Sequence, residues 1–213
     1  MRNFALRNHE DRRPFFEEAQ TRFGLVASSI EKDFWVCWTL QELFGLPGWH
    51  NQLTFKGGTS LSKAWGLISR FSEDIDVVIS REFLGFSGET LGSKRQKKLR
   101  KRCSDCIQNE LAPALERRFA DILQEGTWRL LIADETEDPD RQTLLFHYSS
   151  TFGDSTVGYV RPVVKIEFGA RSETEPVDLP SIEPYLAKVF PDLLKGAFFP
   201  SPPWRPGAPS GKK

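Results

Sequence analysis

Apolar residues recur every three or four positions in two segments near the start of the chain. The segments are residues 14–23 and 30–44, and this spacing predicts a pair of helices. Ser28 and Glu31 have the spacing of a capping box, which would mark the start of the second helix. We therefore expect residues 1–50 to form an N-terminal helical segment that packs on the core of the protein.

Farther along the chain, short apolar or alternating runs between turn residues predict strands. The alternation in the last of them puts Lys165 and Glu167 on one face of the strand. A helix over 94–115 would carry its apolar residues on one side. The predicted strands are 53–55, 74–79, 128–134, 143–148 and 160–168, with further short helices at 59–67 and 187–194.

Composition sets bounds on location and partners. The chain has 213 residues and 39% hydrophobic content, which is ample for a folded core. Its 29 basic and 29 acidic residues cancel, so attraction to nucleic acid would have to come from local clusters. The chain has no membrane-length apolar run and no signal-peptide core, and its cysteines, Cys37, Cys103 and Cys106, lack scaffold spacing. These features predict a cytoplasmic protein without a membrane partner.

An acidic pair and a glycine pair carry the clearest chemistry. Asp74 and Asp76 are two residues apart at the start of a predicted strand, so both carboxylates point to one face. Gly57, Gly58 and Thr59 come before them, after a strand and at the start of a predicted helix whose amides would face an anion. Carboxylates beside a phosphate-binding turn are what Mg²⁺ needs when it bridges protein and nucleotide. The pattern indicates a nucleotidyl-transfer site.

The string FKGGTSLSKAWGLISRFSEDIDVVI resembles the signature of the AbiEii/AbiGii toxin family of nucleotidyltransferases, a branch of the polymerase-β-like superfamily. The resemblance extends to residues 30–35 and 164–168 and covers about residues 25–195. It implies an α+β fold whose polymerase-β-like core, a mixed β-sheet flanked by helices, occupies residues 51–198. It also implies that the strand with Glu167 neighbours the Asp-x-Asp strand.

The resemblance and the pattern together suggest a role for each site residue. Asp74, Asp76 and Glu167 would hold two Mg²⁺ ions, with Glu167 as a ligand near the attacking hydroxyl or as its base. Lys63 and Lys165 have solvent exposure as an equal alternative to phosphate contact. The residues expected to bind the nucleoside triphosphate are Gly57, Gly58, Thr59, Ser72, Lys63 and Lys165.

A basic run follows the predicted active-site strand. Its ordinary interpretation is a solvated helix face, and the functional one is contact with the phosphates of an RNA acceptor. Seven of the nine residues from 94 to 102 are basic: Lys94, Arg95, Lys97, Lys98, Arg100, Lys101 and Arg102.

The end of the chain changes in composition. Residues 199–213 are rich in proline and are expected to be a disordered tail, in the place where the resembled family continues into a helical half. We expect a C-terminally truncated toxin of a toxin–antitoxin or phage-defence pair, which transfers a nucleotide to nucleic acid, with the tRNA 3′ end as acceptor and a winged-helix antitoxin as partner. The alternatives are a non-catalytic nucleotide- or RNA-binding remnant and a metal-dependent phosphohydrolase.

Overall fold

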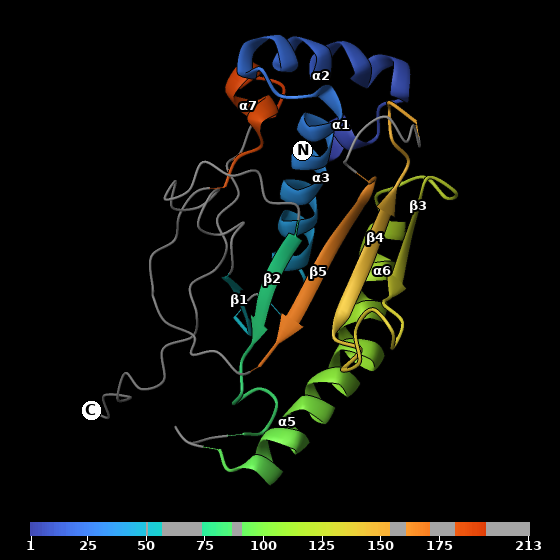
Figure 1. The fold of residues 1–213 in the computed structure, drawn as a ribbon. Coiled ribbons are helices and arrows are strands. Elements are labelled where there is room, and N and C mark those ends of the chain that lie inside the picture. Colours follow the sequence, from blue (N-terminus) through green and yellow to red (C-terminus); the bar gives the residue numbers. More distant parts are fainter. Residues whose placement is uncertain (50, 57–73, 87–90, 154–160, 171–181, 195–213) are drawn as a thin grey trace, which may run out of the picture.

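The computed structural model describes residues 1–49, 51–56, 74–86, 91–153, 161–170 and 182–194 (Figure 1). Its helices are α1 (Arg2–Ala5), α2 (His9–Phe23), α3 (Ala27–Phe44), α5 (Ser93–Cys106), the π-helical segment η2 (Ile107–Leu111), α6 (Ala112–Ala120) and α7 (Tyr185–Val189). Its strands are β1 (Leu53–Lys56), β2 (Asp74–Ile79), β3 (Trp128–Ile132), β4 (Thr143–Tyr148) and β5 (Val163–Gly169).

The strands form one mixed five-stranded sheet in the order β1-β2-β5-β4-β3. Strands β2 and β5 are parallel, and the other neighbours are antiparallel. Parallel pairing requires a long connection, because the chain must return to the same end of the sheet. Here the segment between β2 and β5 includes α5, α6, β3 and β4, so the central pair joins strands far apart in sequence. The prediction of an α+β fold with a mixed sheet and flanking helices is confirmed.

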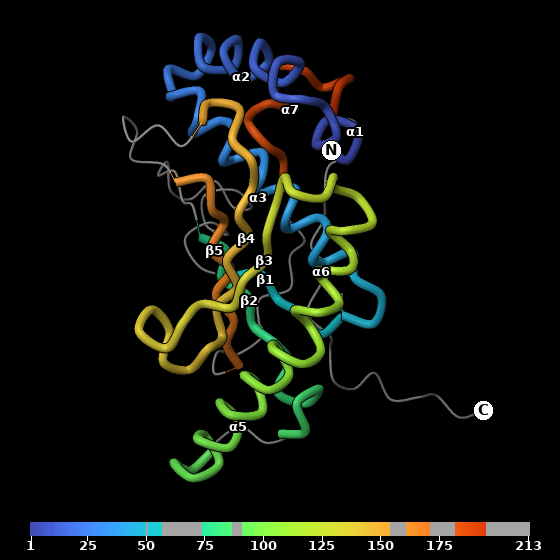
Figure 2. Tube along the Cα trace, turned by 90° about the vertical axis from the view of Figure 1, so that its right-hand side faces the viewer, coloured from blue at the N-terminus to red at the C-terminus, as the bar shows by residue number. Residues whose placement is uncertain are grey.

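One face of the sheet is covered by helices. On β5, Val164, Ile166 and Phe168 are buried, while Lys165 and Glu167 between them are only partly buried. Figure 2 shows α3 and α6 on one side of the strands. Because side chains alternate along a strand, burial of one set places the charged set on the opposite face. The alternation predicted for this strand is confirmed.

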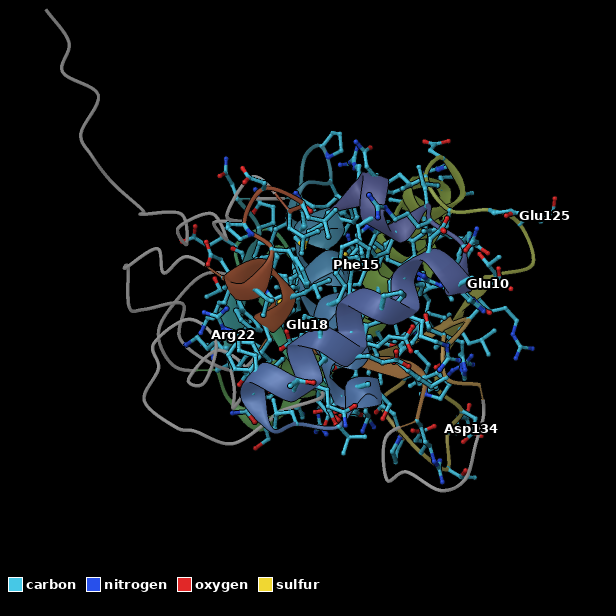
Figure 3. All side chains as sticks on the ribbon, turned by 90° about the horizontal axis from the view of Figure 1, so that it is seen from above. Glu10, Phe15, Glu18, Arg22, Glu125 and Asp134 are labelled. Carbon is cyan, nitrogen blue, oxygen red and sulfur yellow. The ribbon has the colours of Figure 1, made fainter. Side chains whose placement is uncertain are left out.

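Helix α3 is buried on nearly all sides. Trp38 stacks on Phe146 of β4 at 5.6 Å between ring centroids and also contacts Phe119 of α6 at 4.8 Å. Figure 3 shows α2 crossing this end of the molecule beside α7, with Phe15 and Arg22 labelled along α2. A helix that is surrounded by a sheet and other helices has almost no solvent-exposed side. The charged residues of α3 are therefore buried inside the protein and need partners there.

The predicted capping box at the start of α3 is wrong. The helix begins at Ala27, and Val26 at its N-cap makes no side-chain hydrogen bond. The Ala27 amide donates instead to Gln20 Oε1 of α2 at 3.1 Å. Glu31 is fully buried and binds a distant loop, so a tertiary contact replaces the local cap.

Two further helix boundaries differ from the predictions. Helix α2 starts at His9, not at Pro14, because Asn8 Oδ1 accepts the Asp11 amide at 2.8 Å and caps the helix earlier. Helix α7 ends at Val189 because Pro191 cannot continue it. Among the described residues, no helix is both long and apolar enough to cross a bilayer.

Candidate active site

The acidic pair lies on the face of the sheet opposite α3 and α6, which is not covered by a helix of the described residues and is called the open face below. Both residues belong to β2, where Asp74 is exposed, Asp76 is partly buried and the intervening Ile75 is buried on the helix side. Strand β2 begins at Asp74, so the acidic pair lies at the start of the strand, as predicted. The shared direction of the two carboxylates follows from the pleat of this strand.

Strand pairing places a third carboxylate beside the pair. In the parallel β2–β5 register, Asp76 is the partner of Glu167 and Asp74 is the partner of Lys165. Neighbouring strands lie about 4.8 Å apart, so side chains on one face of paired residues are close together. The expected neighbourhood of Glu167 and the Asp-x-Asp strand is thus present, and the roles of these side chains stay a prediction.

A lysine already neutralises part of this charge. Lys165 Nζ lies 2.6 Å from Glu167 Oε1, and both side chains are about one-third to two-fifths exposed (31% and 43%). This hydrogen bond is the main cause that raises the pKa of Lys165, so its ammonium group keeps its charge. Lys165 therefore contacts a carboxylate of the site, which neither of its predicted alternatives, phosphate contact or simple solvent exposure, includes.

The electrostatics of Asp76 show that the carboxylates repel one another. Burial raises the pKa of the Asp76 carboxyl above its ordinary value, and the charges of Glu167 and Asp74 and a hydrogen bond with Glu167 raise it further. The charge of Lys165 opposes this shift. Accumulated negative charge of this kind favours either a proton or a cation at the site.

The donor chemistry fits a magnesium ion. The three carboxylates offer only hard oxygen ligands, which Mg²⁺ prefers over nitrogen or sulfur. Among the described residues, no three Asp, Glu, His or Cys side chains converge closely enough to form a complete metal site. Mg²⁺ commonly takes one or two carboxylates and completes its coordination with substrate phosphates and water. Asp74, Asp76 and Glu167 are suited to that kind of shared site.

One residue that sequence reasoning missed is Lys56. It is the last residue of β1 and the antiparallel partner of Asp76, so both lie on the open face. Lys56, Asp76 and Glu167 therefore form one row across three strands. Its position directly before Gly57 in the sequence was a clue to this role. Only the strand register puts its side chain beside the acidic pair.

The predicted nucleotide-binding turn cannot be placed. Gly57, Gly58, Thr59, Lys63 and Ser72 lie outside the described residues, as does the short helix expected over 59–67. Strand β1 ends at Lys56, and Gly57 follows it directly in the sequence.

The basic run forms the start of α5, as expected, but it does not lie beside the acidic pair. Helix α5 begins beyond the carboxyl end of β2, whereas Asp74 is the first residue of β2 (Figure 1). The strand between them spans about 16 Å at 3.3 Å per residue. Adjacency in sequence is therefore not adjacency in space here.

The basic run divides into two parts. Its later members are paired with acidic side chains: Arg100 with Asp140 at 3.8 Å, Lys101 with Asp105 at 3.4 Å and Arg102 with Glu110 at 2.9 Å. Its earlier members, Lys94, Arg95, Lys97 and Lys98, are exposed. The first turn of α5 contains no acidic residue, although the positive end of the helix dipole favours one.

Buried charges of α3 hold the loops around the sheet. Glu31 accepts hydrogen bonds from Ser150 Oγ at 2.7 Å and the Thr151 amide at 2.9 Å, at the end of β4. Lys32 Nζ donates to the Arg161 carbonyl at 3.0 Å, just before β5. The sequence did not predict these contacts, because it favoured a local cap for Glu31 and the partners are distant in the chain.

A third charge of α3 positions the last helix. Asp33 Oδ2 accepts the Tyr185 amide at 2.7 Å and so binds the first residue of α7. Three consecutive charged residues of α3 thus contact three separate segments that follow β4 in the chain. The triplet connects the N-terminal helices to the strand that carries Glu167.

Comparison with known protein families places the chain in a family. The family model for the nucleotidyl transferase AbiEii toxin of the type IV toxin–antitoxin system matches residues 38–201. The chain belongs to the AbiEii family. The family resemblance stated from the sequence is therefore confirmed, on most of the chain.

A solved structure with a similar fold is MenT4, a nucleotidyltransferase toxin from Mycobacterium tuberculosis H37Rv. The two sequences are 16% identical, and the TM-score is 0.45. The match covers 90% of this AbiEii chain and 55% of the MenT4 chain. No curated protein matches the sequence.

Proposed function

We propose that this AbiEii chain is a toxin that transfers a nucleoside monophosphate from a nucleoside triphosphate to a nucleic-acid hydroxyl, with release of pyrophosphate. The observation that carries the proposal is the row of charged side chains on the open face of β1, β2 and β5. Asp74, Asp76 and Glu167 lie there on two parallel neighbouring strands, next to the start of a glycine pair. Family membership supports the same reaction class.

Asp74, Asp76 and Glu167 would hold two Mg²⁺ ions together with the phosphates of the nucleotide. When bound, the ions would lower the pKa of the attacking hydroxyl and neutralise charge on the leaving pyrophosphate. Glu167 would orient the acceptor hydroxyl or accept its proton. Its contact with Lys165 at 2.6 Å would keep the carboxylate in position before substrate enters.

Lys56 would contribute positive charge at the phosphate side of the row. It precedes Gly57 and is the register partner of Asp76, so its side chain shares the face on which a triphosphate would lie. Gly57, Gly58, Thr59 and the other predicted nucleotide ligands would complete that contact. Charged donors near transferring phosphates stabilise the negative charge that develops in the transition state.

The acceptor that we propose is RNA, with the 3′ end of tRNA as the first candidate. Lys94, Lys97 and Lys98 are exposed at the start of α5, where the helix dipole disfavours positive charge. Contact with RNA phosphates would compensate for this arrangement. The acceptor would then extend along the sheet from the carboxylates toward the start of α5. We also propose a cognate antitoxin of winged-helix type, and a role in phage defence.

The test is incubation of the purified chain with total tRNA, Mg²⁺ and each α-labelled nucleoside triphosphate in turn. The matched variants are an Asp74→Asn, Asp76→Asn double mutant and Asp121→Asn, which changes an exposed carboxylate at the end of α6. Label on RNA with the wild type and Asp121→Asn, but not with the double mutant, would support the transferase. Triphosphate breakdown without an acceptor would indicate a phosphohydrolase, and triphosphate binding without either product would indicate a non-catalytic remnant.

A further inference from the structure

A second site lies on the helix-covered face of the sheet. An open cavity of about 550 Å³ is lined by the start of α2, the turn between α6 and β3 and the end of β4. Its volume is in the range of ordinary small-molecule sites. Figure 3 shows Glu10, at the start of α2, on the same side of the molecule as Glu125 in the turn before β3. Trp128 and Tyr148, a register pair on β3 and β4, line the cavity on the face opposite Asp76.

The wall of this cavity contains buried donors without acceptors. In the described part of the chain, its residues contribute four buried polar atoms that lack a hydrogen-bond partner: Nε and Nη1 of Arg12, Nε1 of Trp35 and Nε1 of Trp128. All four are N–H groups. A buried donor without a partner costs about 1–3 kcal/mol, and more when it is charged. These atoms are shielded from solvent, so a ligand that supplies hydrogen-bond acceptors would remove that cost when the side chains of Arg12 and Trp128 turn toward the cavity.

Among these donors, Arg12 gives the strongest indication of an anion-binding site. Its side chain is only 3% exposed, and it packs over the Trp35 ring at 5.3 Å. Within the described residues, the guanidinium donates one long hydrogen bond, from Nη2 to the Ser149 carbonyl at 3.5 Å. Burial lowers the pKa of Arg12, although the charge of Glu31 opposes this. A guanidinium in this state is a strong donor for an anion that enters the cavity.

The backbone adds a second, independent attraction for negative charge. Helix α2 has 15 residues; its N-cap Asn8, whose side chain accepts the Asp11 amide, and its first residues His9 and Glu10 are part of the cavity lining. The N-terminus of a helix presents free amides and the positive end of its dipole. Glu10 is the acidic residue of the lining and would lie at the edge of the bound anion.

We propose that this cavity binds a small organic anion, with its carboxylate or phosphate at Arg12 and the start of α2 and its flat apolar part against Trp128. The indole ring of Trp128 is half-buried and packs edge-on against Phe119 at 5.7 Å. Tyr148 stacks on Trp35 at 5.2 Å and forms another aromatic wall. This site is separate from the carboxylate row, which lies on the other face of the sheet.

The test is isothermal titration calorimetry, in which small-molecule probes are titrated into the full chain in EDTA at constant ionic strength. The probes are two matched pairs: adenosine monophosphate with adenosine, and benzoate with benzyl alcohol. We expect at least one anion to bind about tenfold or more tightly than its uncharged match, since hydrogen bonds to charged groups contribute about 1.5–3 kcal/mol. The pair that responds tells phosphate from carboxylate recognition.

Variants of the lining residues test whether the anion binds in this cavity. Trp128→Phe keeps an aromatic ring and removes one donor, and it should weaken the anion about tenfold without loss of fold by circular dichroism. Arg12→Gln should abolish the preference for the anion. Trp49→Phe is the matched control, because Trp49 packs on Phe83 away from the cavity, and it should bind normally. Equal binding of charged and uncharged probes, or full affinity in a folded Trp128→Phe, would overturn the proposal.

Adenosine monophosphate could bind either to this cavity or to the candidate active site, so a further variant distinguishes the two sites. An Asp74→Asn, Asp76→Asn variant should bind adenosine monophosphate as the wild type does. If that variant binds adenosine monophosphate with a different affinity from the wild type, in either direction, the nucleotide occupies the carboxylate row and the proposal is wrong for phosphates. The result does not depend on catalysis, because no divalent cation or acceptor is present.

Discussion

Replacement of Asp76 by asparagine should stabilise the protein in the absence of divalent cations. Asp76 and Glu167 are paired on parallel strands about 4.8 Å apart. At an effective dielectric constant of about 20, two like charges at that separation repel by about 3.5 kcal/mol. Lys165, in contact with Glu167, and solvent screening cancel most of this, so we expect a gain of about 1 kcal/mol, or about 2–4 °C in Tm.

The gain should depend on pH in a defined direction. The pKa of Asp76 in the folded protein lies above the ordinary value of 3.8, so the folded state binds a proton that the unfolded state has released. The free energy of unfolding of the wild type therefore falls as pH rises from about 3.8 through the raised pKa, and the loss persists at higher pH. The difference between Asp76→Asn and wild type should be smallest in acid and fully present at neutral pH.

Urea denaturation across this pH range, with and without Mg²⁺, measures both effects. Mg²⁺ should stabilise the wild type more than Asp76→Asn, because a cation bound only to the folded state adds stability by mass action. Asp121→Asn is the exposed control and should change neither quantity. The reasoning is refuted if Asp76→Asn destabilises the metal-free protein at neutral pH, or if its effect does not vary with pH.

Three further predictions concern the core and the buried groups. Glu31→Gln should lower the free energy of unfolding by about 2–3 kcal/mol, since it weakens bonds to a buried loop, whereas the exposed Glu17→Gln should change it little; urea titration compares them. Trp38→Ala should cost about 3–5 kcal/mol in the same assay, and a loss below about 1 kcal/mol would contradict its central position. Burial is the main cause that raises the pKa of Cys103 to about 12 and of Cys106 to about 11, so neither thiol should react quickly with a disulfide reagent at pH 8 until the protein unfolds.

The carboxylate face shows how far local pattern can predict a site. Two aspartates at i and i+2 must share a face of any strand, and the same rule pairs Lys165 with Glu167 on β5. Pleat geometry depends only on the backbone, so these placements could be predicted. The pairing of β2 with β5 could not be worked out in this way, because it joins distant segments; the family resemblance supplied it.

The wrong capping box and the unpredicted place of the basic run have a common physical origin. Glu31 fits a local capping rule, but a buried carboxylate binds whichever donors the fold brings to it, and here they come from the loop after β4. The place of the basic run relative to the carboxylates was not predicted, and the structure shows that β2 carries the chain away from them before α5 begins. Contacts between segments far apart in the chain decide both cases, and short sequence windows do not contain them.

The sequence by itself determined the presence of the longer helices and of the strands, the shared face of Asp74 and Asp76, and the family, since these depend on periodicity and on a specific motif. Only the tertiary structure decided that Lys56 stands beside Asp76 and that Arg12 is buried without a full set of partners. Register and burial arise from the packing of the whole chain. A charge that is ordinary in the sequence therefore gains its chemical meaning from its neighbours in space.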